Sequence, residues 1–295
     1  MKSIALAAAL LSGCVNTGNV YTPGGPCCSN NVTYLCVGME SSARFGSCPG
    51  CELDAKRLSS LMKDQYGYAG DLLVSGMATK AEVVGLLRKG VESTPEDGLF
   101  LFFYSGHGGQ EYLGGKEPDG ADREDEFLCL YDTYLMDDEI WDIVSTCKGR
   151  VFLYFDACHS ATMYRSVASD LSKPVGPSKT KRVATALALN ENVFVESKGF
   201  TFRPERFVKA SPMEASDKAS APRILCWSGC KESEYSYGSN SGGTLTTCVV
   251  SNWKKGTTYD DLWEKAREDV KKMQETQNPV QTYVGAFPAG TEAFR

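Results

Sequence analysis

The sequence is poor in histidine, lacks a long apolar run and carries no excess of positive charge. Its 295 residues include only two histidines, at positions 107 and 159. This scarcity excludes histidine-rich zinc sites, and any thiol–imidazole chemistry must use one of these two side chains. No stretch approaches the roughly 18 apolar residues that a membrane-spanning helix requires. A net charge of −6 gives no basic field, so we expect no nucleic-acid partner.

Cysteine, in contrast, is abundant, with twelve residues in the chain. Several of them fall inside expected strands, where a free thiol packs as a small apolar side chain. Disulfide frameworks are more typical of smaller secreted proteins, so we favour structural thiols. Hydrophobic residues make up 42% of the chain and charged residues 23%, which indicates a soluble globular protein with a sizeable core.

The first 14 residues have the features of a signal peptide, with Lys2, an apolar run at 4–11 and small residues after it. Residues 11–14 (L-S-G-C) also resemble a bacterial lipobox, in which Cys14 would carry a lipid. A poorly ordered tail explains the same residues, and both interpretations stay open. The localisation stays open with them: cytoplasmic if the terminus is uncut, secreted or envelope-anchored if it is cleaved. A lipid on Cys14 is the only membrane contact that we expect, and residues 15–31 form a flexible arm.

Strand-like and helix-like segments alternate through most of the chain. Strands are expected at residues 33–39, 72–74, 99–104, 151–156 and 223–229, with an edge strand at 282–287. Helices are expected at residues 52–64, after a capping box at 79–82, from residue 137 and at 259–277. This alternation predicts an α/β fold with a mostly parallel central sheet and helices on both faces. Residues 166–222, rich in Lys, Arg, Ser and Pro, interrupt the pattern as a basic linker.

Two of the expected strands end in turns that carry reactive side chains. Residues 104–109 read Y-S-G-H-G-G, and residues 156–160 read D-A-C-H-S. Because ligand sites lie beyond the carboxyl ends of strands in open parallel sheets, Cys158 is a candidate nucleophile. His107 is a better partner for it than His159, since sequence neighbours on a strand point to opposite faces. The glycines beside His107 allow close backbone approach, and the Gly108 amide is a candidate oxyanion donor.

These two motifs together resemble the metacaspases, which are caspase-like cysteine peptidases of clan CD. About 50 residues separate the histidine from the cysteine, as in caspases. Further similarities are G-C-x-x-D-A at residues 50–55, acidic stretches at 119–126 and 131–139, and S-G-C-K at 228–231. The resemblance covers residues 32–287, which is most of the chain.

The resemblance implies a caspase-like three-layer sandwich. Residues 32–165 would form its large part and residues 223–295 its small part, joined by the basic linker. Cys158 would be the nucleophile and His107 the general acid/base, with the amides of Gly108 and Cys158 stabilising the oxyanion. We expect a monomer that acts on protein or peptide substrates.

Metacaspases cleave after Arg or Lys, and their specificity pocket maps onto Cys51, Asp54, Ser105 and Asp156. Two carboxylates in a desolvated pocket suit a guanidinium or ammonium group. The same preference leads to the hypothesis that the protein processes itself in the basic linker, near residues 179–182 (K-T-K-R).

Many metacaspases need calcium, and the implied ligands match Asp125, Asp137 and Asp138, whose hard oxygen atoms suit that ion. The chain departs from the family pattern at Arg165, where the family has a fourth carboxylate. Two further departures are Ala161 in place of glycine and Leu53 in place of asparagine. Helix capping is the alternative role for residues 137–138. No organic cofactor is expected.

Three other functions account for parts of the sequence. Residues 48–51 (C-P-G-C) form a CxxC between a strand and a helix, as in thioredoxin-like redox proteins. A zinc site is the second alternative, built from Cys48, Cys51, Cys226 and Cys230. A catalytically weak caspase-like scaffold or binding protein is the third.

Overall fold

The computed structural model describes residues 31–112, 124–157, 222–231 and 234–295, with short pieces at 185–186, 194–196, 200 and 202. At 110–112, 124–125, 185–186 and 194–196 it describes the backbone alone. The signal-like N-terminus, the arm, Cys158, Ala161, Arg165 and nearly all of the basic linker lie outside the described residues. The predictions made for those positions therefore stay predictions.

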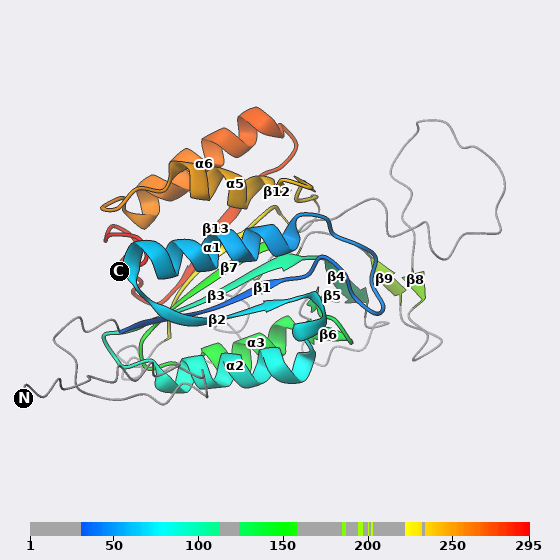
Figure 1. Cartoon of the computed structure of the whole chain (residues 1–295), viewed down its shortest axis with the longest axis horizontal. Helices are drawn as coiled ribbons and strands as arrows, with labels where there is room; N and C mark the ends of the chain where they lie inside the picture. Colours follow the sequence, from blue (N-terminus) through cyan, green and yellow to red (C-terminus); the bar gives the residue numbers. More distant parts are fainter. Residues whose placement is uncertain are drawn as a thin grey trace, which may run out of the picture.

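A six-stranded sheet forms the centre of the molecule (Figure 1). Its strands lie in the order β13-β10-β7-β3-β1-β2, and only β13, at one edge, runs antiparallel to its neighbour. The strands are β1 (Val32–Gly38), β2 (Ala69–Val74), β3 (Leu99–Gly106), β7 (Arg150–Ala157), β10 (Arg223–Ser228) and β13 (Val280–Val284). The mostly parallel sheet predicted from the alternation of elements is confirmed.

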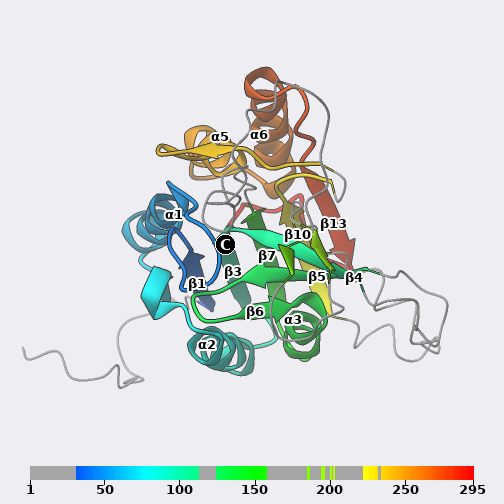
Figure 2. The same cartoon turned by 90° about the vertical axis from the view of Figure 1, so that its right-hand side faces the viewer.

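Helices cover both faces of this sheet, which gives the molecule three layers (Figures 1 and 2). One face carries α1 (Cys51–Tyr66), α5 (Thr244–Asn252) and α6 (Tyr259–Met273). The other carries α2 (Lys80–Ser93) and α3 (Asp137–Val144), with the short 3-10 helix η1 (Ser75–Met77) before α2. The predicted three-layer α/β architecture is confirmed.

The central strand β3 shows how the sequence supports two cores at once. All eight of its residues are buried. Because successive side chains alternate between the faces of a sheet, Phe100 and Phe102 pack in the core on the side of α2 and α3. Leu101 and Phe103 pack in the other core, with residues of α1, α5 and α6. A strand covered on both faces must be apolar throughout, which is the pattern that the sequence shows.

A second sheet, of short antiparallel strands, follows β3 directly in the order β6-β5-β4-β9-β8. Its strands are β4 (Gly108–Tyr112), β5 (Glu124–Cys129), β6 (Tyr134–Met136), β8 (Thr185–Ala186) and β9 (Phe194–Glu196). A small hairpin consists of β11 (Gly238–Ser239) and β12 (Gly242–Gly243). The sequence pattern predicts little of this, because such short strands leave almost no periodicity to detect.

The C-terminal part differs from the prediction in three places. Helix α5 is not predicted, because its sequence TLTTCVVSN is rich in β-branched residues and its burial, not its propensity, decides its state. Helix α6 ends at Met273 and not at residue 277, and Gln277 is fully buried. The edge strand β13 pairs with β10 over Val280–Val284, so it starts two residues and ends three residues earlier than predicted. Among the described residues, none of the helices combines the length and the apolar character that crossing a bilayer requires.

Two glycines on α2 offer a matched test of the packing between this helix and the sheet. A Cβ atom at Gly90 would lie 2.2 Å from the Phe100 ring, whereas one at Gly85 would meet nothing within 4 Å. We expect Gly90→Ala to lower the free energy of unfolding by about 1–3 kcal/mol, because the buried ring leaves no room. Gly85→Ala should raise it by about 1 kcal/mol through helix propensity. Urea unfolding in the Cys158→Ala background measures both, and equal effects would contradict the packing.

Candidate active site

The strand register brings the two predicted reactive turns to the same edge of the sheet. In the parallel β3–β7 pair, Ser105 lies opposite Asp156 and Gly106 lies opposite Ala157. His107 follows Gly106 directly, and Cys158 follows Ala157. Cys158 itself lies outside the described residues, so the distance from its sulfur to the imidazole is not part of the structure. What the register does place side by side are the strand ends that lead into the histidine and the cysteine.

His107 is buried, with 2% of its surface exposed, and its ring is oriented by the backbone of a distant loop. Its Nε2 atom lies 3.3 Å from the carbonyl oxygen of Ser47. An imidazole that donates from Nε2 to this carbonyl keeps Nδ1 free of a proton, and Nδ1 is then the atom that can accept one. The carbonyl of His107 accepts hydrogen bonds from the Tyr104 hydroxyl and the Cys129 amide, which fixes the turn itself.

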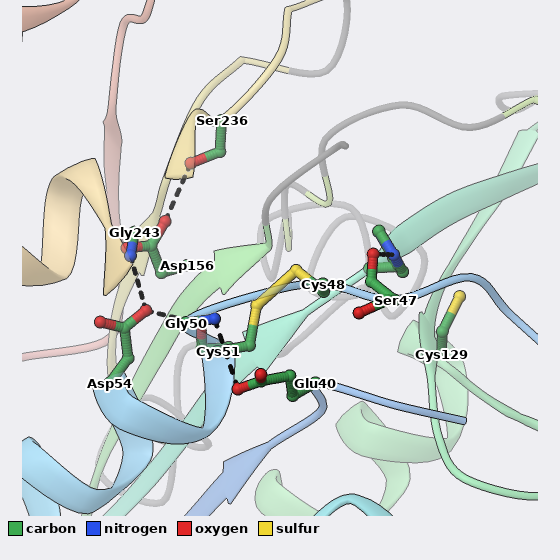
Figure 3. Close-up of a disulfide and its surroundings, with 12 residues drawn as sticks. Glu40, Ser47, Cys48, Gly50, Cys51, Asp54, Cys129, Asp156, Ser236 and Gly243 are labelled. Carbon is green, nitrogen blue, oxygen red and sulfur yellow. Dashed lines mark hydrogen bonds between the residues drawn. A yellow bond between two sulfur atoms is a disulfide. The ribbon is translucent and has the colours of Figure 1, made fainter. Parts of the chain in front are cut away.

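Asp54 lies in the first turn of α1 and is fully buried, so it is not the solvated helix residue that its position alone would indicate. Its Oδ2 accepts hydrogen bonds from the Ser105 hydroxyl at 3.0 Å and from the Gly243 amide at 2.7 Å (Figure 3). Its other oxygen, Oδ1, is buried and has no hydrogen-bond partner among the described residues. A buried carboxyl oxygen without a donor is costly, which indicates that the site is built to receive one.

Asp156, at the end of β7, is the second fully buried carboxyl group. Its Oδ1 accepts from the Ser236 hydroxyl at 2.9 Å (Figure 3). Its Oδ2 accepts from the Thr246 amide at 2.8 Å. Gly243 lies between the two carboxyl groups: its amide donates to Asp54, and a Cβ there would lie 2.2 Å from Asp156 Oδ2. At Gly242, whose φ is +105°, a Cβ would lie 2.1 Å from Asp54 Oδ1. Only glycine lets this hairpin come so close to both acids.

The two carboxyl groups resist being charged at the same time. Burial raises the pKa of Asp54 to about 8, and the nearby charge of Asp156 adds to this effect. Burial raises the pKa of Asp156 as well, against the donors that stabilise its anion. The Arg57 guanidinium attracts Asp54, but its Nη1 donates to the Ser241 carbonyl at 2.6 Å. A cation placed between the two acids would allow both to ionise.

Cys51, the fourth predicted pocket residue, is joined to Cys48 by a disulfide with a Cα–Cα distance of 6.0 Å. Both residues are buried at the start of α1, between Ser47, which contacts His107, and Asp54 (Figure 3). The zinc hypothesis is therefore wrong for this pair of cysteines, and the described residues contain no cluster of three or more metal-binding side chains. Six other cysteines of the described residues are buried thiols, as the preference for structural thiols predicts: Cys36, Cys129, Cys147, Cys226, Cys230 and Cys248.

The residues predicted to bind calcium do not form a complete site within the described part of the chain. Asp137 is buried at the start of α3, and its Oδ1 accepts a hydrogen bond from the Asp138 amide at 3.1 Å. Asp138 is exposed, and the side chain of Asp125, on β5, lies outside the described residues. Calcium takes about six to eight oxygen ligands. The two described carboxylates do not fit that ion on their own, and their position in the first turn suits the helix dipole.

Sequence reasoning misses several residues that complete the site. Ser236, Thr246 and Gly243 of the β11–β12 hairpin donate hydrogen bonds to the two acids, and the Ser47 carbonyl contacts the histidine. Most of these contacts use backbone atoms, and the partners lie 60 to 189 positions apart along the chain. The run of glycines at 238–243 is the one local signal that could have indicated a close backbone approach.

Comparison with known proteins agrees with this geometry. The profile of the Caspase domain family matches residues 34–285. Metacaspase-1A of Aspergillus fumigatus is 27% identical over 248 residues, which are 74% of this chain and 59% of that protein. Metacaspase-1 of Pyricularia oryzae is 28% identical over 287 residues, covering 85% of this chain and 71% of the other. The chain thus spans about three fifths of the length of the Aspergillus fumigatus relative.

Solved structures support the fold. A protein from Geobacter sulfurreducens superimposes with a TM-score of 0.60 at 24% identity, covering 88% of this chain and 96% of the other. Caspase-1 from Spodoptera frugiperda superimposes with a TM-score of 0.50 at 13% identity, covering 86% of each chain. These matches show a caspase-like fold and not the thioredoxin-like fold that the motif at residues 48–51 suggested as an alternative. The chain belongs to the Caspase domain family, and its curated relatives include metacaspases.

Proposed function

We propose that this protein is an endopeptidase that cleaves after Arg or Lys, with Cys158 as nucleophile and His107 as general acid/base. The observation that carries the specificity is the buried pair of Asp54 and Asp156, in which one carboxyl oxygen of Asp54 has no donor among the described residues. A guanidinium or ammonium group would supply both the missing donor and the missing charge. An acidic substrate side chain would meet two carboxyl groups and be repelled.

In the proposed reaction the Cys158 sulfur attacks the substrate carbonyl carbon while His107 takes the thiol proton. The amides of Gly108 and Cys158 stabilise the charge that develops on the carbonyl oxygen. The C–N bond then breaks, and the leaving amine takes the proton from His107. Water, activated by His107, hydrolyses the thioester and restores the thiol. Throughout the cycle the Ser47 carbonyl would keep the ring in one orientation.

Fluorogenic peptides that end in Arg, Lys or Asp before the reporter test this proposal. We expect turnover of the Arg and Lys peptides and none of the Asp peptide. Cys158→Ala and His107→Ala should each lower kcat by a factor on the order of 10³ or more, as losses of a nucleophile or its base do. Turnover that survives in Cys158→Ala, or a preference for Asp, would contradict the assignment.

The raised pKa of Asp54 predicts how substrate affinity depends on pH. Below about pH 8 the group holds a proton in the free protein, and binding of a cation must release it. We therefore expect KM for an Arg peptide to fall as the pH rises from 6 to 8 and then to level off. A peptide with citrulline, the neutral analogue of Arg, is the matched control and should show no such fall. The pH profiles of KM for both peptides are the measurement.

The Asp54→Asn variant separates this pocket from the rest of the catalytic site. It should lower kcat/KM for the Arg peptide by about 30-fold or more, the scale for removing one member of a buried charge pair. It should also unfold less easily at pH 8, since an acid whose pKa is raised by folding loses stability as the pH rises from its unfolded pKa to its folded one. Loss of activity together with loss of stability at pH 8 would argue for simple misfolding.

Calcium stimulation and self-processing are two further proposals, supported by the family resemblance and by the basic linker. We expect the intact mass of the purified protein to fall on incubation through a cut near residues 179–182, while the Cys158→Ala protein keeps its mass. Adding calcium or a chelator to parallel samples tests the ion separately. Equal masses for both proteins would contradict self-processing, and equal rates with calcium and chelator would contradict stimulation.

A further inference from the structure

Behind Asp156, on the side away from Asp54, lies a chain of buried polar groups that the reaction scheme does not use. Ser236 donates to Asp156, and Gln277 in turn donates to Ser236. Both residues are fully buried. Ser236 precedes the β11–β12 hairpin, and Gln277 follows α6, in the stretch where the sequence predicts helix and the chain instead turns inward. A buried amide and hydroxyl aimed at an active-site acid need an explanation.

The amide of Gln277 can be oriented in only one way. Its Nε2 donates to the Gly229 carbonyl at 2.8 Å and to the Ser236 hydroxyl at 3.0 Å. Its Oε1 accepts from the Tyr237 amide at 3.1 Å. Rotating the amide by half a turn would oppose oxygen to oxygen at Gly229 and N–H to N–H at Tyr237. Three backbone and side-chain partners therefore hold the NH2 group against Ser236.

This orientation determines the direction of the next hydrogen bond. A serine hydroxyl has one hydrogen, and in Ser236 the oxygen already accepts from Gln277. Its hydrogen is then directed at Asp156 Oδ1, 2.9 Å away. The Thr246 amide donates to Oδ2. Both oxygens of Asp156 thus receive fixed donors, whereas Oδ1 of Asp54 receives none among the described residues.

Resting on the proposed function, we infer that Gln277 is a positioning residue that acts through Ser236 to keep Asp156 as the ionised member of the acid pair. Asp54 is then the member that holds the proton until a substrate cation arrives. The pair enters each cycle with one negative charge already aimed at the Arg or Lys side chain. Donors fixed by the fold cost nothing to orient when the substrate binds, which is the usual advantage of preorganisation.

Other titratable groups around Asp156 do not explain why Asp156, and not Asp54, would be the ionised acid. Asp54 and Arg57 come from α1, Tyr154 from β7, Cys230 from the turn after β10 and Cys248 from α5. Burial raises the pKa of the tyrosine and of both thiols, so these three are neutral near pH 7. Arg57 lowers the pKa of Asp54, so it opposes this asymmetry between the two acids and cannot be its source.

We call the hydrogen-bonded series Gln277–Ser236–Asp156 the relay. Two variants test it, and a third serves as control. Ser236→Ala removes the hydroxyl hydrogen, and Gln277→Glu replaces the donor with an acceptor of the same shape. Each should raise KM for the Arg peptide by ~10- to 100-fold at pH 7, the scale of one hydrogen bond to a charged group, and leave kcat within about threefold. Gln274→Glu places the same charge change in the same segment, outside the relay, and should leave KM within about twofold.

The dependence on pH separates the relay from a structural effect. If Asp156 loses its donor, it ionises at higher pH, so the increase in KM should shrink as the pH rises from 6 to 9. An increase that is the same at every pH, an unchanged KM, or a fall in kcat alone would overturn the inference. In the double variant that combines Ser236→Ala with Gln277→Glu, the KM should match that of Ser236→Ala alone within a few-fold, because Gln277 acts through the Ser236 hydroxyl.

Failure of the relay and failure of the proposed function are distinguishable. Absence of Arg and Lys cleavage by the unaltered protein would refute the proposed function alone. The relay is then measured without substrate, in Cys158→Ala protein, by the free energy of unfolding between pH 5 and pH 8. A higher folded pKa for Asp156 means that Ser236→Ala should lose stability with rising pH more steeply than its parent. Parallel curves would overturn the relay.

Discussion

Two buried carboxyl groups beside each other, Asp54 and Asp156, are the constraint on which the rest of this site depends. Each carboxylate would be strongly disfavoured in isolation, and the second charge is disfavoured further by the first. The protein tolerates the arrangement by bringing backbone amides to both acids, from Gly243 to Asp54 and from Thr246 to Asp156. The local cost is therefore offset by one segment of the C-terminal part, residues 243–246, which reaches both acids.

The need to stabilise both acids accounts for the glycines of the β11–β12 hairpin, and the loop before α1 connects the acids to His107. Gly242 and Gly243 let one backbone segment touch both acids, at distances that any side chain would prevent. The disulfide between Cys48 and Cys51 links the segment that contacts His107 to the helix that carries Asp54. His107 and Asp54 are thus both positioned by one short stretch of backbone, residues 47–54. A displacement of that stretch would move the contacts of both His107 and Asp54.

The sequence alone predicts the helices and strands that are determined by the pattern of neighbouring residues. Continuous apolar runs identify β3 and β7, and the reactive side chains in the turns that follow them indicate His107 and Cys158. Family resemblance adds Asp54, Ser105 and Asp156, of which the structure joins Asp54 to Ser105 by a hydrogen bond. The groups that control the acids are not predictable in this way, because backbone amides leave no residue signature. The state of α5 and the inward turn at Gln277 depend on burial, which appears only once the sheet is assembled.

The position of β10 in the central sheet has a consequence for the integrity of the molecule. This strand lies between β7 and β13, and its six residues pair in register with β7. The acids on one side of the linker are held by Gly243 and Thr246 on the other. A chain severed anywhere between β7 and β10 would therefore persist as a non-covalent heterodimer. Its two fragments would share one sheet, and neither fragment by itself could hold the two acids together with the amides that bind them.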